Sequence, residues 1–72
     1  MKRFDLEAAK RGDPIVCRNG TPAHFIAYGN VDHAYSVVVK VRDRIEMYTN
    51  NGSFINGDDR NGFDLFMVSE EF

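Results

Sequence analysis

The chain has 72 residues, a formal net charge of -2 and 43% hydrophobic residues. This length allows one small domain, and six Phe, three Tyr and three Met must supply much of its core. The mixed charge argues against strong nonspecific binding to a polyanion and against the dense negative surface of a DNA mimic. The single cysteine, Cys17, excludes an internal disulfide.

Nothing in the sequence predicts a membrane segment. No run of about 20 apolar residues occurs, and the N-terminal stretch MKRFDLEAAKRGDP lacks the apolar core of a signal peptide. We therefore expect a single small β-rich domain over residues 1–72, located in the cytoplasm and without a membrane partner.

The first predicted element is a short helix over residues 4–11. Asp5 is a favourable N-cap, Ala8 and Ala9 are strong helix formers, and Gly12 can close the helix. Because two turns of helix are unstable alone, this segment is expected to dock on the sheet.

A hairpin is predicted to follow the helix. Residues 15–18 form its first strand, and Asn19-Gly20 is the sequence typical of a two-residue type I′ turn. In that register Cys17 lies opposite Pro22, whose missing N–H points away from the first strand. This predicts a sheet edge or a bulge at Pro22.

The return strand is predicted over residues 24–28. Gly29-Asn30 ends it, and residues 30–33 are a polar connection to the next strand.

The longest apolar-rich stretch of the chain is predicted to be a pair of strands. The side chains expected to share its buried face are Val37, Val39, Val41, Ile45 and Met47. Placing both sets on one face requires Val41 opposite Ile45, with a loop over residues 42–44. The same register places Lys40 opposite Glu46, a favourable cross-strand pair.

Asn51-Gly52 predicts a tight turn with two possible registers. A two-residue turn places Thr49 opposite Phe54, whereas a longer loop turns Phe54 to the other face. A short strand is expected over residues 53–55.

The end of the chain also leaves two alternatives. Residues 56–62 contain no apolar side chain and predict an exposed loop. In residues 63–68 either both faces are covered, or a turn at Asp64 and Leu65 precedes a last strand. Residues 69–72 are an acidic tail, in which Phe72 is either a packing anchor or a frayed end.

Together these elements predict a mainly β (α+β) domain. We expect a twisted antiparallel sheet of about five short strands with one short N-terminal helix. The sheet is either curled into an SH3-like, partly open small barrel or open and backed by the helix.

The residues able to support chemistry do not form a recognisable motif. Cys17 beside Arg18 would need a base, and the predicted register places His24 diagonal to it. His24, His33 and Asp32 lack the spacing of metal ligands. We therefore expect no enzyme activity, no catalytic residue, no metal site and no cofactor.

A cluster of cations at the tip of the central hairpin is the main candidate binding surface. The candidate binding residues are Lys40, Arg42, Arg44 and Tyr48. Aromatic side chains beside cations can hold single-stranded nucleic acid on a small barrel. Asp43 and Glu46 interrupt the cluster and the net charge is negative, so nucleic-acid binding is the alternative function rather than the first.

Both ends of the chain resemble a known group of proteins. The segments FDLEAAKRGDPIVCRNGTPA, NNGSF and GFDLFMV are similar to short proteins of tailed-phage and prophage genomes that begin with FDLxxAxxGxP and finish with DLFM. These proteins carry an RDG-like turn, which here is Arg18-Asn19-Gly20. The residues matched at both ends, expected to be core anchors, are Phe4, Leu6, Phe63 and Leu65.

The resemblance implies a phage context, and hence the host bacterial cytoplasm, without transferring catalytic residues. We expect a non-enzymatic accessory protein that acts by stoichiometric binding. It would inhibit a host or anti-phage defence factor, or sequester a small signalling ligand. The small core also makes homo-oligomerisation an option.

Overall fold

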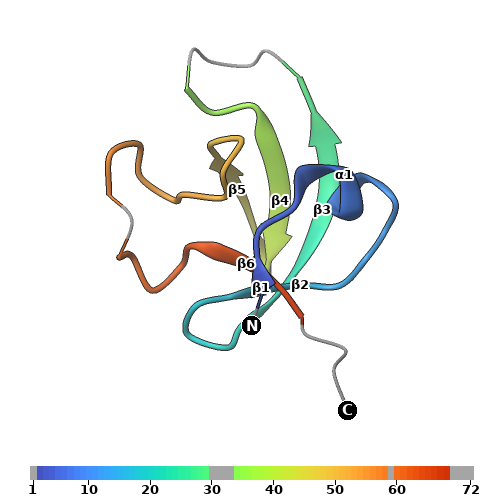
Figure 1. The fold of residues 1–72 in the computed structure, drawn as a ribbon, viewed down its shortest axis with the longest axis horizontal. Helices are drawn as coiled ribbons and strands as arrows, with labels where there is room; N and C mark the ends of the chain where they lie inside the picture. The colour runs from blue at the N-terminus through green and yellow to red at the C-terminus, as the bar shows by residue number, and fades with distance from the viewer. Residues whose placement is uncertain (1, 30–33, 59, 69–72) are drawn as a thin grey trace.

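The structure, a computed structural model, describes residues 2–29, 34–58 and 60–68. The described residues form six strands and one short helix, and the strands make the strongly curved sheet that Figure 1 shows. In chain order the elements are β1 (Lys2–Arg3), α1 (Leu6–Lys10), β2 (Ile15–Cys17), β3 (Pro22–Tyr28), β4 (Val37–Val41), β5 (Arg44–Tyr48) and β6 (Leu65–Met67). The expected connection over residues 30–33 and the tail over residues 69–72 lie outside the described residues.

The strands form one antiparallel sheet in the order β1-β6-β2-β3-β4-β5. Strands β2 to β5 are a meander, and β6 returns to pair with the other side of β2. Within the described residues no ladder joins the outermost strands β1 and β5, so the sheet is open. The predicted mainly β fold with one short helix is confirmed, and the two-residue strand β1 is the addition.

Helix α1 is shorter than the predicted range over residues 4–11, but its N-cap is Asp5 as expected. The Asp5 side chain accepts a hydrogen bond from the Ala8 N–H at 3.2 Å, as an N-cap does. Arg11 is the C-cap, and Gly12 follows with a φ of 95°. Ala8 and Ala9 are buried, and the Lys10 ammonium lies 4.4 Å from the centre of the Tyr28 ring on β3. The helix therefore docks on the sheet, and no helix in the described part of the chain is long and apolar enough to cross a bilayer.

The predicted register of the central hairpin is wrong by one residue. Val41 lies opposite Arg44, so the loop has two residues, Arg42 and Asp43, in place of the expected three. Arg42 adopts a φ of 56°, which the first position of a type I′ or II′ turn requires. Lys40 consequently faces Ile45, and the expected Lys40 to Glu46 pair is not formed.

This register exchanges the two faces of β5. Val37, Val39 and Val41 are buried as predicted, but Ile45 is 59% exposed. The side chain that joins the valines in the core is Tyr48, which is 0% exposed. The alternating side chains of β5 are compatible with either register. The length of the loop decides whether Ile45 or Tyr48 faces the core.

The core lies on this concave side of the sheet, between the meander, the N-terminal segment and β6. Its members are Phe4, Ala8, Ala9, Ile15, Cys17, Ala23, Val37, Val39, Val41, Tyr48, Leu65 and Met67.

The first hairpin also has a shifted register. Pro22 lies opposite Val16, and the Cys17 N–H donates to the Thr21 carbonyl at 2.8 Å, so the loop spans residues 18–20. The predicted pairing of Cys17 with Pro22 is therefore wrong. Pro22 is not at a sheet edge either, since β3 lies between β2 and β4. It is tolerated because it begins the strand at a level where β4 has already ended at Val41.

A bulge does occur in β3, but three residues further on. The register between β3 and β4 shifts between Phe25 and Ala27, which leaves Ile26 unpaired.

The second half of the chain contains fewer strands than predicted. The Thr49 N–H donates to the Ser53 carbonyl, so the turn is the longer of the two alternatives and spans residues 50–52. The expected strand over residues 53–55 is reduced to one isolated bridge between Ile55 and Asp58.

A turn at residues 62–63 precedes β6, close to the second alternative for this segment. Of the four residues predicted to be core anchors, Phe4 and Leu65 are buried and Leu6 packs against the core. The prediction for Phe63 is wrong, because its side chain is 41% exposed.

Candidate ligand-binding cavity

The four residues predicted to bind a partner do not form one surface. Lys40, Arg42 and Arg44 are exposed at the end of the β4–β5 hairpin. Tyr48 is in the core, so the expectation that it is an exposed stacking surface is wrong. The Arg44 guanidinium is bound to Glu46, with its Nη2 2.8 Å and its Nε 3.1 Å from the Glu46 Oε2.

The other aromatic side chains near the hairpin are used within the protein. The Phe54 ring packs against Tyr48 with 5.5 Å between ring centres. The Tyr35 hydroxyl accepts a hydrogen bond from the Asn56 N–H at 2.9 Å. Both side chains are half-buried, so they support the segment over residues 54–56 more than they extend the cation cluster.

Cys17 and Tyr48 are the two buried titratable groups of the core. Burial raises the pKa of the Cys17 thiol, and the Tyr48 hydroxyl beside it opposes part of that rise. Burial also raises the pKa of the Tyr48 phenol, to which the neighbouring Cys17 contributes. A thiol with a raised pKa is a poor nucleophile. His24 is exposed on the opposite face of the sheet, so it is not placed to act on Cys17.

No group of three or more His, Cys, Asp or Glu side chains gathers in metal-binding geometry within the part of the chain that the structure describes.

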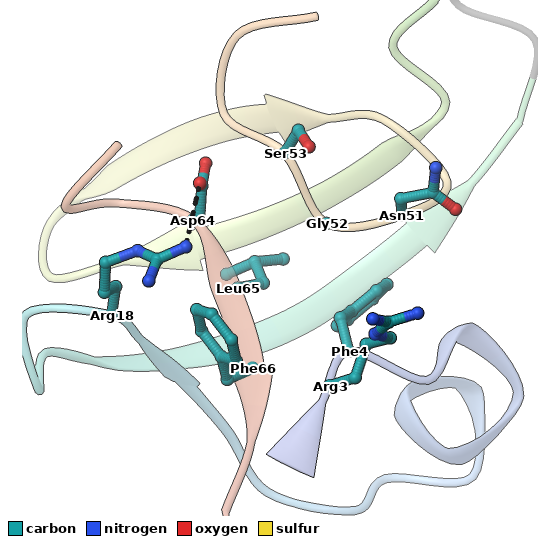
Figure 2. Close-up of a pocket in the computed structure, with 9 residues that line it drawn as sticks. All are labelled: Arg3, Phe4, Arg18, Asn51, Gly52, Ser53, Asp64, Leu65 and Phe66. Atoms are coloured by element: carbon teal, nitrogen blue, oxygen red, sulfur yellow. Dashed lines mark ion pairs between the residues drawn. The ribbon is translucent and has the colours of Figure 1, made fainter. Parts of the chain in front are cut away.

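A concave site that the sequence does not predict lies beside β6. It is a cavity of about 440 Å³ at which β1, the β2–β3 loop, the turn over residues 50–52 and β6 meet. We call it the arginine cavity, and its lining residues, drawn in Figure 2, are Arg3, Phe4, Arg18, Asn51, Gly52, Ser53, Asp64, Leu65 and Phe66.

The sheet order places its two arginines on either side of β6. Arg3 on β1 lies directly opposite Phe66, and β2, which Arg18 follows, pairs with the other side of β6. Figure 2 shows the two side chains on the two sides of the β6 ribbon, with the Phe66 ring between their labels. Two cations from distant parts of the sequence are thereby brought to one site.

Arg18 is held in place by several contacts. Its Nη2 is 3.6 Å from the Asp64 Oδ2, and its Nε donates to the Asn61 carbonyl at 3.3 Å. The guanidinium carbon lies 4.8 Å from the centre of the Phe66 ring, in cation–π range. A guanidinium fixed in this way loses little freedom when it binds an anion.

Arg3 is in a different situation. Its side chain is exposed, and it forms no hydrogen bond or ion pair with any other described residue. Its donors therefore face the cavity and solvent without an acceptor from the described part of the chain.

Asp64 is the acidic group of the cavity, and its oxygens are already used. It is 5% exposed, its Oδ1 accepts from the Phe54 N–H at 2.8 Å, and its Oδ2 accepts from the Asn61 N–H at 3.1 Å. The carboxylate ties the loop over residues 54–61 to β6 and pairs with Arg18. The cavity is lined by two guanidinium groups and by one carboxylate whose oxygens already accept hydrogen bonds. Its net charge is therefore positive.

Neutral polar groups complete the wall at the turn over residues 50–52. The side chains of Asn51 and Ser53 line the cavity and make no hydrogen bond to another described residue. Gly52 brings this turn close to the N-terminal segment: its Cα is so near Phe4 that an added Cβ would lie 2.8 Å from the Phe4 Cβ. This close contact between the Gly52 backbone and the Phe4 side chain fixes the position of the cavity wall.

Only indirect signals of this site are present in the sequence. Arg18 lies in a segment that resembles the phage proteins and Arg3 directly precedes that segment, but nothing in their spacing indicates that β6 lies between β1 and β2. The buried role of Asp64 was not foreseen, because the segment GFDLFMV was interpreted for its apolar residues.

Comparison with curated proteins and with solved structures finds no match for the chain. Comparison with protein families finds one described as Haemophilus phage HP1 protein YO09, which matches residues 1–71. This match confirms the expected phage context and spans nearly the whole chain. The protein therefore belongs to the Haemophilus phage HP1 protein YO09 family.

Proposed function

We propose that this phage-family protein acts by stoichiometric binding, without catalysis, and that the arginine cavity holds a small anionic ligand. The single observation that carries the proposal is that two guanidinium groups line the same cavity, one on each side of β6, and that Arg3 has no acceptor among the described residues. Guanidinium groups bind phosphate and carboxylate through two parallel hydrogen bonds, which makes them the preferred side chains for such anions.

The remaining lining residues fit the same ligand class. Asn51 and Ser53 offer donors and acceptors for the polar edge of a ligand, and Phe66 supplies an apolar surface. The volume of about 440 Å³ lies within the range of small-molecule sites, about 300 to 1,000 Å³. Of the two modes expected from the sequence, sequestration of a small signalling ligand is the one this cavity supports.

The ligand can be tested directly by isothermal titration calorimetry with the purified full chain. The probes are inorganic phosphate, a nucleoside monophosphate and a dinucleotide, which share the phosphate group and differ in apolar surface. We expect saturable binding of at least one probe with one ligand per chain. Arg3→Gln is expected to weaken it about tenfold or more, because a charge-assisted hydrogen-bond pair is lost.

Lys2→Gln is the matched control. Lys2 is the neighbouring cation on β1 and does not line the arginine cavity. It should change the affinity by less than about twofold, since only long-range screening is altered. Absence of binding by all three probes, or equal weakening by the two variants, would contradict the proposal. Inhibition of a host or defence protein, bound at the protein surface and not in the cavity, would then become the leading function.

Single-stranded nucleic-acid binding at Lys40, Arg42 and Arg44 is the second candidate. The observation in its favour is that all three side chains are exposed at one end of the hairpin. The pairing of Arg44 with Glu46 and the burial of Tyr48 weaken it. Fluorescence anisotropy of a labelled oligonucleotide, titrated against salt, separates the two: this candidate predicts a steep loss of affinity with salt and a shallower slope in Arg42→Gln.

A further inference from the structure

Strand β5 is an edge of the sheet, and its outer backbone edge is open. The sheet order ends at β5, which pairs with β4 alone. In a two-residue hairpin the residues that flank the loop, here Val41 and Arg44, are a hydrogen-bonded pair, and such pairs alternate along the ladder. The N–H and C=O groups of Ile45 and Met47 therefore point away from β4, and no described backbone group pairs with them.

The side chains beside this edge are apolar and accessible. Ile45 is 59% exposed, the largest exposed fraction among the large apolar side chains of the described residues. A shallow groove of about 290 Å³ runs beside it, lined by Tyr35, Ile45, Glu46, Met47 and Phe54. Ile45, Glu46 and Met47 are consecutive on β5, so their side chains alternate between the two faces of the sheet. Because all three line the groove, the groove runs along the edge of the strand.

The charges of β5 favour one particular partner, a second copy of the same strand. An antiparallel pair centred on Ile45 places Ile45 opposite Ile45 of the partner subunit and joins their outward-pointing backbone groups. It also places Arg44 opposite Glu46 of the partner subunit, and the two-fold axis repeats that pair. The alternative centre at Glu46 would set two carboxylates directly against each other, which is destabilising.

Most proteins protect an exposed edge strand with a lysine, a proline or a bulge. On β5 the outward apolar side chain is an isoleucine, and neither a proline nor a bulge interrupts the strand. The lysine of this hairpin, Lys40, is on β4, one strand further in. The edge thus keeps the features that permit pairing.

We propose that the protein forms a two-fold symmetric dimer in which the β5 strands of two copies pair antiparallel about Ile45, joining the two sheets into one. The paired strand has five residues, so the interface is at the small end of specific interfaces, below about 1,200 Å². The dimer is accordingly concentration-dependent. No residue of β5 lines the arginine cavity, so dimerisation leaves it free.

Sedimentation equilibrium of the full chain at a series of concentrations tests the dimer. The average mass should rise from 8.2 kDa toward twice that value. Ile45→Lys introduces the edge lysine that blocks pairing and should raise the dimer dissociation constant about 30-fold or more. Ile26→Lys is the matched control, because Ile26 is also an exposed isoleucine but sits on β3, between two strands. It should leave the dissociation constant nearly unchanged.

A charge exchange tests the register. Arg44→Glu places like charges opposite each other twice and should weaken the dimer, whereas the double variant Arg44→Glu/Glu46→Arg restores opposite charges and should recover it. Circular dichroism of each variant checks that the fold is retained. A single 8.2 kDa species at all concentrations overturns the proposal. So does a dimer that Ile45→Lys and Ile26→Lys weaken equally, or one that the double charge exchange does not recover.

Discussion

The two halves of the sheet are built in different ways. Strands β3, β4 and β5 are consecutive in the sequence, joined by short connections, and packed through an alternating apolar face. Strands β1, β6 and β2 come from both ends of the chain and are short, with two or three residues each. The first half is specified by local pattern, whereas the second depends on contacts between distant segments. The candidate ligand site belongs to the second half.

Polar and close backbone contacts carry much of the stability of that second half. The Arg18 N–H donates to the Asp64 carbonyl at 2.8 Å, and the Leu65 N–H donates to the Gly52 carbonyl at 2.8 Å. The Asp64 carboxylate and the Phe4 ring then fix the loops around β6. Single substitutions should therefore separate the two halves clearly.

The largest effect is expected for Asp64→Ala. The substitution removes the buried carboxylate that accepts from the part-buried N–H groups of Phe54 and Asn61, which should lower the free energy of unfolding by about 3 kcal/mol. Urea unfolding followed by circular dichroism measures it. Asp13→Ala is the control, because Asp13 is exposed and its pair with Arg11 should contribute less than about 1 kcal/mol. Similar losses in both variants would mean that Asp64 does not organise the β6 side.

Gly52→Ala should have the next largest effect. The residue has a φ of 86°, and an added Cβ would lie 2.8 Å from the Phe4 Cβ and Cγ. We expect a loss of about 2 kcal/mol or more, from the left-handed backbone and the steric overlap together. Gly57→Ala isolates the backbone part, since Gly57 has a φ of 91° and open space around it, and should cost about 1 kcal/mol. Equal losses at the two glycines would remove the role given to the Phe4 contact.

The difference between the halves also explains what the sequence could predict. The helix cap at Asp5 and the buried valines of β4 follow from local rules and agree with the structure. The faces of β5 were assigned wrongly because one residue in the loop length decides them, and Arg42 adopts a positive φ that its residue type does not favour.

The arginine cavity was beyond local reasoning for a different reason. It exists because β6 inserts between β1 and β2, a pairing of segments more than 40 residues apart that no short-range signal in this chain encodes. The candidate binding residues predicted from the sequence, Lys40, Arg42, Arg44 and Tyr48, lie within nine positions of one another, and a sequence displays only clustering of this local kind.

The corrected face of β5 can be tested by a pair of alanine variants at a concentration at which the protein is monomeric. Val39→Ala removes two methyl groups from a fully buried site and should lower the free energy of unfolding by about 2 kcal/mol. Ile45→Ala, at a side chain that the uncorrected register would bury, should change it by less than about 0.5 kcal/mol. Thermal and urea unfolding of both variants decide the point. A large loss of stability in Ile45→Ala would instead support the register with the three-residue loop over residues 42–44.

Tyr48→Phe should have the smallest effect and the opposite sign. Within the described residues the Tyr48 hydroxyl is buried without a well-formed hydrogen bond, and the Cys17 thiol beside it is a weak partner, so removal of the hydroxyl should raise the free energy of unfolding by about 1 kcal/mol near neutral pH.

The same variant has a signature at high pH. Because burial raises the pKa of the Tyr48 phenol above its ordinary value of 10.0, the folded chain keeps this proton more tightly than the unfolded chain does. The resulting stability is complete below about pH 10 and declines as the pH rises through the folded-state pKa. Tyr48→Phe should therefore show a shallower alkaline decline than the unmodified chain, and the part that remains reports Cys17, whose pKa burial also raises. If the two proteins lost stability identically at high pH, the Tyr48 hydroxyl would be in solvent. The core-facing side of β5 would then be assigned wrongly.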